Sequence, residues 1–282
     1  MKRNCLSLFL FAALLTAQEL QLPNKPDSFH FAVIGDSGTG ERPEYDVAER
    51  LAEFHQKFKF DTVLMMGDNM YGSQKPKDFV KKFEAPYKPL LDAGVKFYAT
   101  LGNHDDPNQR SYKLFNMGGE RYYTFKPRNG IRFFSLDSNY MDKEQLSWLE
   151  KELDSSGSDW KIAFFHHPLY SSGGKHGSDV QLRGVLEPLF LKHEVSVVLA
   201  GHDHFYERIK PQRGITYFVI GGSAKLREGN VVTRSELTGK SFDTDRSFVL
   251  MEIDGDTLYF QAISRSGKIV DSGKVGRRIK AD

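Results

Sequence analysis

The chain has 282 residues, of which 39% are hydrophobic and 27% are charged, and its formal net charge is +2. This composition is that of an ordinary globular protein and excludes a wholly disordered chain. A charge so close to zero gives no electrostatic reason to expect nucleic acid as a partner.

The N-terminal segment has the pattern of a secretory signal peptide. Lys2 and Arg3 precede an apolar stretch over 5–15, and small residues follow around Ala17. The stretch is too short to span a bilayer, which needs about 20 apolar residues. We therefore expect removal of residues 1–17 and a secreted or periplasmic protein without stable membrane insertion. A buried N-terminal helix fits the basic start less well. Loss of Lys2 and Arg3 from a net charge of +2 would leave a mature charge of zero, and loss of Cys5, the one cysteine, would exclude disulfides.

The first half of the chain alternates predicted strands and helices. A strand over 29–34 precedes a helix that opens at Pro43 and carries an apolar stripe for packing on a sheet. His55 lies off this stripe, so we expect it to face solvent or to be partly buried. After a strand over 62–66, the lysines of 75–82 predict a solvated helical face. Prolines and a glycine in 86–94 then break the helix before a strand over 97–101.

The second half contains more strands. Turn residues at 127–130 predict a hairpin, and Asp142 is a predicted helix N-cap. Three glycines around His176 predict a mobile loop over 171–177. His193 is expected to cap the C-terminus of a helix as a cation. The other predicted elements are strands over 162–165, 195–200 and 215–220, a helix over 182–190, a long loop or lid over 223–247, a hairpin over 248–263 and a last strand near 268–270.

Five of the predicted strands end in polar clusters. In open α/β sheets, ligands bind beyond the carboxyl ends of the strands, so these clusters should meet in space. Asp137-Ser138 follows a sixth strand, but one carboxylate alone favours a structural role. The five clusters are Gly35-Asp36-Ser37-Gly38, Gly67-Asp68-Asn69-Met70-Tyr71, Gly102-Asn103-His104-Asp105, His166-His167-Pro168 and Gly201-His202-Asp203-His204.

These residue types predict a metal site. Two ions about 3.5–4 Å apart can clamp the attacking and leaving oxygens of a phosphoryl transfer. Such a site needs a bridging carboxylate, hard oxygen ligands and neutral imidazoles. The clusters supply all three, in Asp36, Asp68, Tyr71, Asn103, His166, His202 and His204.

In this order, the clusters resemble those of the metallophosphoesterase (calcineurin-like) superfamily, over residues 29 to about 208. Most members carry histidine two residues after the first aspartate, where this chain has Gly38. Tyr71 follows Asp68 by three residues. The absence of that histidine together with the presence of this tyrosine resembles the purple acid phosphatases, including the tartrate-resistant type. Ser37 and Met70 replace the usual tryptophan and phenylalanine, which would change the pocket rather than the metal ligands.

The resemblance implies the fold and the cofactors. The expected fold is α/β, a four-layer α/β/β/α sandwich of two mixed sheets flanked by helices. Since the chain shows no repeats and no linker, we expect one domain over 27–277. Two metal ions are implied, with Asp68 bridging. Fe(III) would be held by Asp36, Asp68, Tyr71 and His204, and Fe(II), Zn(II) or Mn(II) by Asp68, Asn103, His166 and His202.

The resemblance also implies the reaction. His104 would hold the phosphate and His176 would assist the leaving group, while His167 would line the pocket. Glu207 would hydrogen-bond around the metal ligands or be a surface charge. The expected protein is a monomeric acid phosphatase that hydrolyses small phosphomonoesters by attack of a metal-held hydroxide on phosphorus. The alternatives are a phosphodiesterase or nucleotide hydrolase of the same superfamily, or a metal-containing binding protein without turnover.

Overall fold

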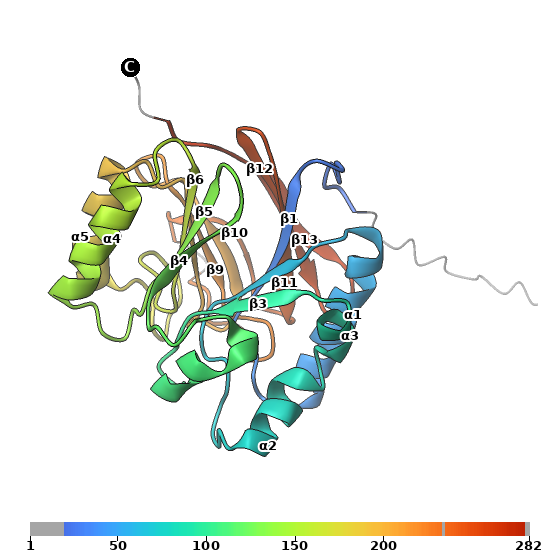
Figure 1. The fold of residues 1–282 in the computed structure, drawn as a ribbon. Helices are drawn as coiled ribbons and strands as arrows, with labels where there is room; N and C mark the ends of the chain where they lie inside the picture. Colours follow the sequence, from blue (N-terminus) through green and yellow to red (C-terminus); the bar gives the residue numbers. More distant parts are fainter. Residues whose placement is uncertain (1–19, 233–234, 280–282) are drawn as a thin grey trace, which may run out of the picture.

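The structure, a computed structural model, describes residues 20–232 and 235–279. Two mixed β-sheets pack face to face, and helices cover the outer face of each (Figure 1). This architecture confirms the fold expected from the sequence. The predicted signal peptide, 1–17, lies outside the described residues. Within the described residues, no helix combines the length and the apolar character needed to cross a bilayer.

The first sheet has the strand order β13-β12-β11-β1-β2-β3. β1 runs parallel to β2, which runs parallel to β3, whereas β11, β12 and β13 are antiparallel to their neighbours. The three parallel strands therefore end at the same edge. The strands are β1 (Phe29–Ile34), β2 (Thr62–Met65), β3 (Lys96–Ala99), β11 (Ser247–Asp254), β12 (Thr257–Ser264) and β13 (Ile269–Gly276).

The second sheet has the order β10-β8-β9-β7-β6-β5-β4. Its four central strands, β9, β7, β6 and β5, are parallel to one another. The strands are β4 (Tyr123–Arg128), β5 (Ile131–Ser135), β6 (Trp160–Phe164), β7 (Val197–Ala200), β8 (Tyr206–Ile209), β9 (Thr216–Ile220) and β10 (Thr238–Phe242).

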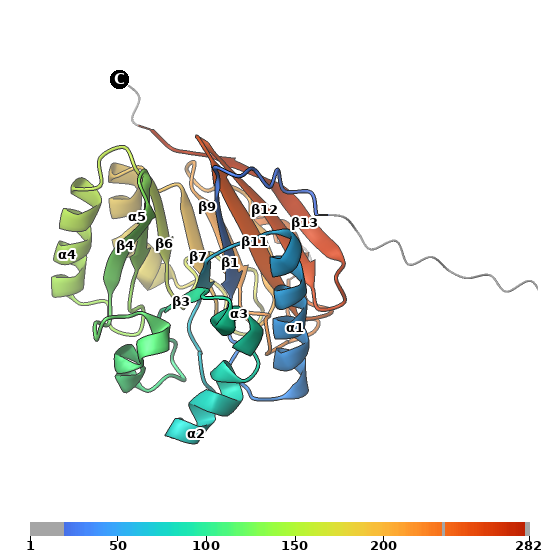
Figure 2. The same cartoon turned by 45° about the vertical axis from the view of Figure 1, so that its right-hand side comes forward.

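Helices complete the outer layers. Figure 2 shows α1 and α3 beside the first sheet, and α4 and α5 on the far side of the second. The α-helices are α1 (Arg42–Lys57), α2 (Pro76–Phe79), α3 (Lys88–Asp92), α4 (Lys143–Asp154) and α5 (Val180–Lys192). A π-helix, η1 (Val80–Glu84), follows α2, and two 3-10 turns are η2 (Pro107–Ser111) and η3 (Lys113–Phe115).

Three apolar clusters fill the three spaces between the layers. In β1, Ala32 and Ile34 contact the cluster under α1, while Phe31 and Val33 contact the cluster between the sheets. A third cluster joins the second sheet to α4 and α5. Because both faces of β1 are buried, its sequence is a continuous apolar run rather than an alternating one.

Two side chains expected near solvent are buried. His55 is only 7% exposed, and its Nε2 lies 3.0 Å from the carbonyl oxygen of Phe60. Lys82 is 8% exposed and donates from Nζ to the carbonyl oxygens of Tyr71 and Ser73, at 2.6 and 2.5 Å. Lys82 therefore supports the loop of Tyr71 instead of solvating a helical face.

Three other expectations are met only in part. His193 is the C-cap residue of α5, as predicted, but it is buried, and burial lowers its pKa and so disfavours the cationic form. The helix before segment 86–94 does end, with a turn at 85–87, but the segment itself also contains a short helix, α3. The segment 223–247 contains an edge strand, β10, which pairs with the unpredicted β8. Short polar strands like these lack the apolar period that identifies buried ones.

Candidate metal centre

Parallel strands of both sheets carry the predicted donors to one rim. β1, β2 and β3 lead to the clusters that contain Asp36, Asp68 and Asn103, and β6 and β7 lead to those of His166 and His202. These strands end at corresponding edges of two packed sheets. The structure therefore brings together all seven predicted donors, including Tyr71 and His204, in two adjoining groups.

The first group surrounds the hydroxyl of Tyr71. The hydroxyl oxygen lies 2.9 Å from Asp36 Oδ1, 2.9 Å from Asp68 Oδ2 and 3.2 Å from His204 Nε2. His204 Nε2 and Asp36 Oδ1 are 3.3 Å apart. Donor atoms that bind one ion at about 2.1 Å are separated by about 3.0–3.4 Å, so these spacings fit a single cation.

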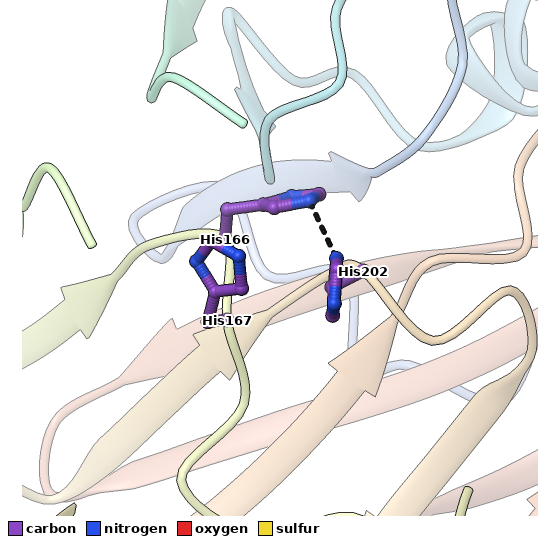
Figure 3. Close-up of side chains that lie close together, drawn as sticks. All are labelled: His166, His167 and His202. Carbon is purple, nitrogen blue, oxygen red and sulfur yellow. Dashed lines mark hydrogen bonds between the residues drawn. The ribbon is translucent and has the colours of Figure 1, made fainter. Parts of the chain in front are cut away.

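The second group surrounds Nε2 of His166. This atom lies 3.1 Å from Asn103 Oδ1, 3.1 Å from His202 Nδ1 (Figure 3) and 3.4 Å from Asp68 Oδ1. Nδ1 of His166 lies 2.8 Å from the carbonyl oxygen of Met66, which can only accept, so a neutral His166 carries its proton there. Its Nε2 lone pair then faces two oxygen acceptors, an arrangement that a cation would stabilise.

Asp68 contacts both groups, one through each carboxylate oxygen. Oδ2 accepts from Tyr71 in the first group, and Oδ1 lies near His166 in the second. Oδ1 also accepts the backbone N–H of His104 at 2.9 Å. Asp68 would therefore be able to bridge two cations, one held by each group.

The charges of the site also fit cations. Burial, and then the negative charge of Asp68, raises the pKa of Asp36 well above its ordinary value. Burial lowers the pKa of His202 to about 2 and that of His204 to about 4. The imidazoles are therefore held in the neutral form that binds metals, while the crowded acidic groups need positive charge.

Three donor residues have left-handed backbone conformations. The φ angles of Asp36, Asp68 and His202 are 53°, 49° and 67°. Such angles are unfavourable for residues with a side chain and often occur at functional sites. Here they turn the chain sharply after each strand, and the N–H of His202 donates to Asp36 Oδ2 at 2.9 Å.

The two predicted catalytic histidines lie exposed beside different donor groups. The His104 ring centroid is 4.9 Å from that of Tyr71, and the His176 ring centroid is 4.2 Å from that of His202. A substrate that spans the two groups would therefore have an imidazole within reach at either end.

The loop that carries His176 is held at several points. Gly177 N–H donates to Asp203 Oδ2 at 3.1 Å, and Gly174 N–H donates to the Asn230 carbonyl at 2.8 Å. Ser172 N–H donates to Glu207 Oε2 at 2.8 Å. Glu207 is fully buried and anchors this loop, so the alternative of a surface charge is wrong.

The sequence of the chain is similar to those of a known enzyme family. The sequence model described as calcineurin-like phosphoesterase matches residues 29–206. The chain belongs to this family. It is 24% identical to human tartrate-resistant acid phosphatase type 5, over 96% of this chain and 99% of that protein. These matches make the chain a metallophosphoesterase with purple acid phosphatase relatives.

Two solved structures share the fold of the phosphoesterase. GAP50, described as the anchor in the inner membrane complex of Plasmodium, matches with a TM-score of 0.78 and 19% identity, over 90% of each chain. Purple acid phosphatase PPD1 of yellow lupin matches with a TM-score of 0.74 and 20% identity, over 91% of this chain and 55% of that one.

A cavity of about 510 Å³ opens beside the second donor group of the phosphoesterase. Asn103 and His167 line it, and His167 Nδ1 lies 2.9 Å from the hydroxyl of Ser138. His167 therefore lines a cavity, as expected, but its ring also lies close enough to His166 and His202 to form a three-histidine group with them (Figure 3). Asp137 has the structural role expected of it, because it pairs with Arg121 at 3.0 Å.

Three residues of the phosphoesterase site were missed in the sequence. Asp203, which is fully buried, accepts from Ser171 Oγ at 2.5 Å and from the loop of His176. After β9, Lys225 lies over the Tyr71 ring, 4.6 Å from its centroid, and the Arg227 N–H donates to the His204 carbonyl oxygen at 3.0 Å. Asp203 lies inside the cluster Gly201-His202-Asp203-His204, which indicates a role at the site. The segment that contains Lys225 and Arg227 has no apolar periodicity and no motif.

Proposed function

We propose that the protein is a secreted acid phosphatase that hydrolyses small phosphomonoesters at a binuclear metal centre. The observation that carries the proposal is the sharing of Asp68 between two donor groups, one oxygen to each. One carboxylate between two sets of donors is what a pair of adjacent cations needs.

Asp36, Asp68, Tyr71 and His204 would hold one ion, and Asp68, Asn103, His166 and His202 the other. The phenol and carboxylates suit Fe(III), while the amide and imidazoles suit Fe(II), Zn(II) or Mn(II). Bound ions would supply Lewis acidity and lower the pKa of water.

The remaining roles belong to exposed histidines. His104, beside Tyr71, would donate a hydrogen bond to a phosphate oxygen and orient the ester. His176, beside His202, would give a proton to the departing alcohol oxygen. The backbone bonds that anchor its loop support this assignment, because a proton donor must be held in place.

A rate comparison tests the proposal. Metal-loaded protein at acid pH should hydrolyse an aryl phosphate monoester faster than the matching aryl diester. Faster diester cleavage would favour a phosphodiesterase, and no cleavage of either, with two metals bound, would favour a binding protein. The His202→Ala variant should bind one ion instead of two.

Secretion and oligomeric state are tested separately. The N-terminal sequence of protein recovered outside the cytoplasm should start near residue 18 if the segment 1–17 is a signal peptide. Light scattering of the purified protein should give the mass of a monomer.

A further inference from the structure

A second cavity, of about 650 Å³, lies at the far end of the first sheet from the metal centre. Its walls come from the segment 24–30 at the start of β1, from the residues between α1 and β2, and from the hairpin of β4 and β5. The metal donors instead follow the carboxyl ends of β1 and β2, which run parallel. The cavity is therefore separate from the metal centre, and its lining shares no residue with the donor groups.

The walls of this cavity carry an excess of positive charge. Four cationic side chains and one carboxylate, that of Asp61, give a local charge of +3 with His30 neutral. The whole chain, by comparison, has a formal net charge of only +2. Like charges on one concave surface repel one another, and a bound anion relieves this repulsion. The cationic side chains are those of Lys25, Lys57, Lys59 and Arg128.

Three of these four cations have no acidic partner. Lys25 has one, since its Nζ lies 2.5 Å from Asp254 Oδ2. Across residues 20–232 and 235–279, no carboxylate oxygen lies within 4.0 Å of the charged nitrogens of Lys57, Lys59 or Arg128. These three charges are therefore free to bind an anionic ligand.

Contacts with the backbone hold two of the cations in place. Arg128 donates from Nη1 to the carbonyl oxygen of Asp27. The carbonyl oxygen of Lys59 lies 2.8 Å from His30 Nδ1, and the His30 ring stacks on Phe58 with the ring centroids 4.2 Å apart. The guanidinium of Arg128 and the backbone of Lys59 are thus positioned in advance, which lowers the entropic cost of binding a ligand.

A buried carboxylate anchors the N-terminal wall. Glu252 of β11 is fully buried, and its two oxygens accept the N–H groups of Asn24 at 2.7 Å and Lys25 at 2.9 Å. The side-chain amide of Asn24 donates to the carbonyl oxygen of Lys57 at 3.1 Å. This wall is therefore attached both to the sheet and to the end of α1, while Glu252 itself does not line the cavity.

The base of the cavity is apolar. Phe29 and Phe60 line it and are only 6% and 3% exposed, whereas Lys57, Lys59 and Arg128 are exposed at the rim. Cavities of this volume accommodate a small organic molecule rather than a single ion. A compact ligand with several anionic groups on a less polar body matches both the rim and the base. A concave site also fits such a molecule better than it fits the flat surface of a bilayer.

We propose that this cavity is an anion-binding site for a glycan that carries two or more phosphate or sulfate groups. Lys57, Lys59 and Arg128 bind the anionic groups, and the sugar body lies against Phe29 and Phe60. The site goes beyond the proposed function, because a glycan held at this end leaves the metal centre open. The protein is thereby retained on an anionic glycan while it acts on a small substrate.

Calorimetry of the metal-loaded protein with sucrose octasulfate, a compact polyanion with a disaccharide body, tests the site. Lys59→Gln and Arg128→Gln should each weaken binding about 10-fold, the effect of losing one charge-assisted hydrogen bond. The double variant Lys57→Gln/Lys59→Gln should weaken it further. Lys151→Gln removes an exposed charge on α4 and should leave the affinity unchanged. An absence of binding to the wild-type protein, or equal affinities in the wild type and the cavity variants, would overturn the proposal.

Two other titrants distinguish the sources of anionic groups. Inorganic phosphate should bind the cavity at least about 10-fold more weakly than sucrose octasulfate, because it cannot contact several cations at once. Vesicles that contain phosphatidylglycerol should bind no better than neutral vesicles. Strong vesicle binding that is lost in Lys59→Gln would assign these cations to a membrane surface, and phosphate binding as tight as that of the polyanion would assign them to a single phosphate. Either result would overturn the glycan site.

Hydrolysis of p-nitrophenyl phosphate separates the cavity from the metal centre. Saturating sucrose octasulfate should leave kcat/KM unchanged, and Lys59→Gln and Arg128→Gln should hydrolyse this substrate as the wild type does. Competitive inhibition that persists in these variants would place the polyanion at the metal centre and contradict the proposal. The calorimetric test needs no turnover, so a failure of the proposed function would not by itself count against the cavity.

Discussion

The backbone of Gly38 packs directly against the loop that presents Tyr71. The N–H of Tyr71 donates to the carbonyl oxygen of Gly38 at 2.9 Å. A Cβ atom at position 38 would lie 1.7 Å from the carbonyl oxygen of Asn69. The loop that carries Tyr71 can therefore pack this closely only because residue 38 has no side chain.

Gly38→Ala should displace the Tyr71 loop. Because the clash is with backbone atoms, the loop must move and the first donor group loses its geometry. We expect at least tenfold weaker binding at one of the two metal sites, in the range for lost ligand support. Metal analysis after dialysis measures this. Gly72→Ala is the control, because a Cβ at Gly72 meets nothing within 4 Å, although its φ of 69° will cost some stability. Two retained ions in Gly38→Ala would contradict the expectation.

Tyr71→Phe should remove the phenol ligand and leave the fold intact. If Fe(III) occupies the first group, the wild-type protein has a phenolate charge-transfer band in the visible range and the variant does not. Absorption spectra of the wild-type protein and the variant, with metal analysis of both, test whether Tyr71 binds iron. A colourless wild-type protein with zinc or manganese alone would contradict iron at Tyr71, and a band that survives in Tyr71→Phe would contradict its assignment.

Asp203→Asn should loosen the loop of His176 while both ions stay bound. Ser171 Oγ and the Gly177 N–H both donate to Oδ2 of Asp203, and a neutral amide weakens both bonds because they are no longer made to a charged acceptor. We expect kcat to fall about 10-fold, the lower end for a supporting residue, with KM less affected. Ser171→Ala should act in the same direction with a smaller effect. Loss of metal from Asp203→Asn would instead indicate a role in binding the ions.

Glu44 should make the protein less stable as pH rises. It is fully buried, its Oε2 accepts the Gly40 N–H at 2.6 Å, and burial raises its pKa to about 8. Between an unfolded value near 4.5 and this value, the folded state holds the extra proton, so stability falls by up to about 1.4 kcal/mol per pH unit.

Glu44→Gln should therefore raise the melting temperature at pH 8 and leave it nearly unchanged at pH 4. Thermal unfolding at both pH values measures the difference, with the exposed Glu49→Gln on the same helix as control. Equal effects of Glu44→Gln at both pH values would show that the carboxylate does not titrate in this range.

The donors could be predicted from the sequence because each follows a short apolar run. A short, continuously apolar run is typical of a buried parallel strand, and the carboxyl ends of parallel strands lie at the same edge of a sheet. Asp36 and His202 could therefore be predicted to lie at the same rim, although they are far apart in the chain. Their left-handed backbone angles could not be predicted, since they depend on packing around the turn.

The supporting residues were harder to predict because their roles depend on distant partners. Lys82 resembles any surface lysine until the carbonyls of Tyr71 and Ser73 are seen beside its ammonium. Glu207 of β8 accepts the N–H of Ser172, which lies in a loop 35 positions earlier in the chain. Polar side chains without a period carry no signal of burial, so sequence patterns assign them to the surface.

The central place of β1 has a consequence for synthesis of the chain. β1 can pair with β2 early, but its other edge waits for β11, where Val33 lies opposite Val249. On the ribosome, an apolar strand edge therefore stays open until most of the chain has emerged. Open apolar edges pair with other chains, so products truncated before β11 should aggregate rather than fold.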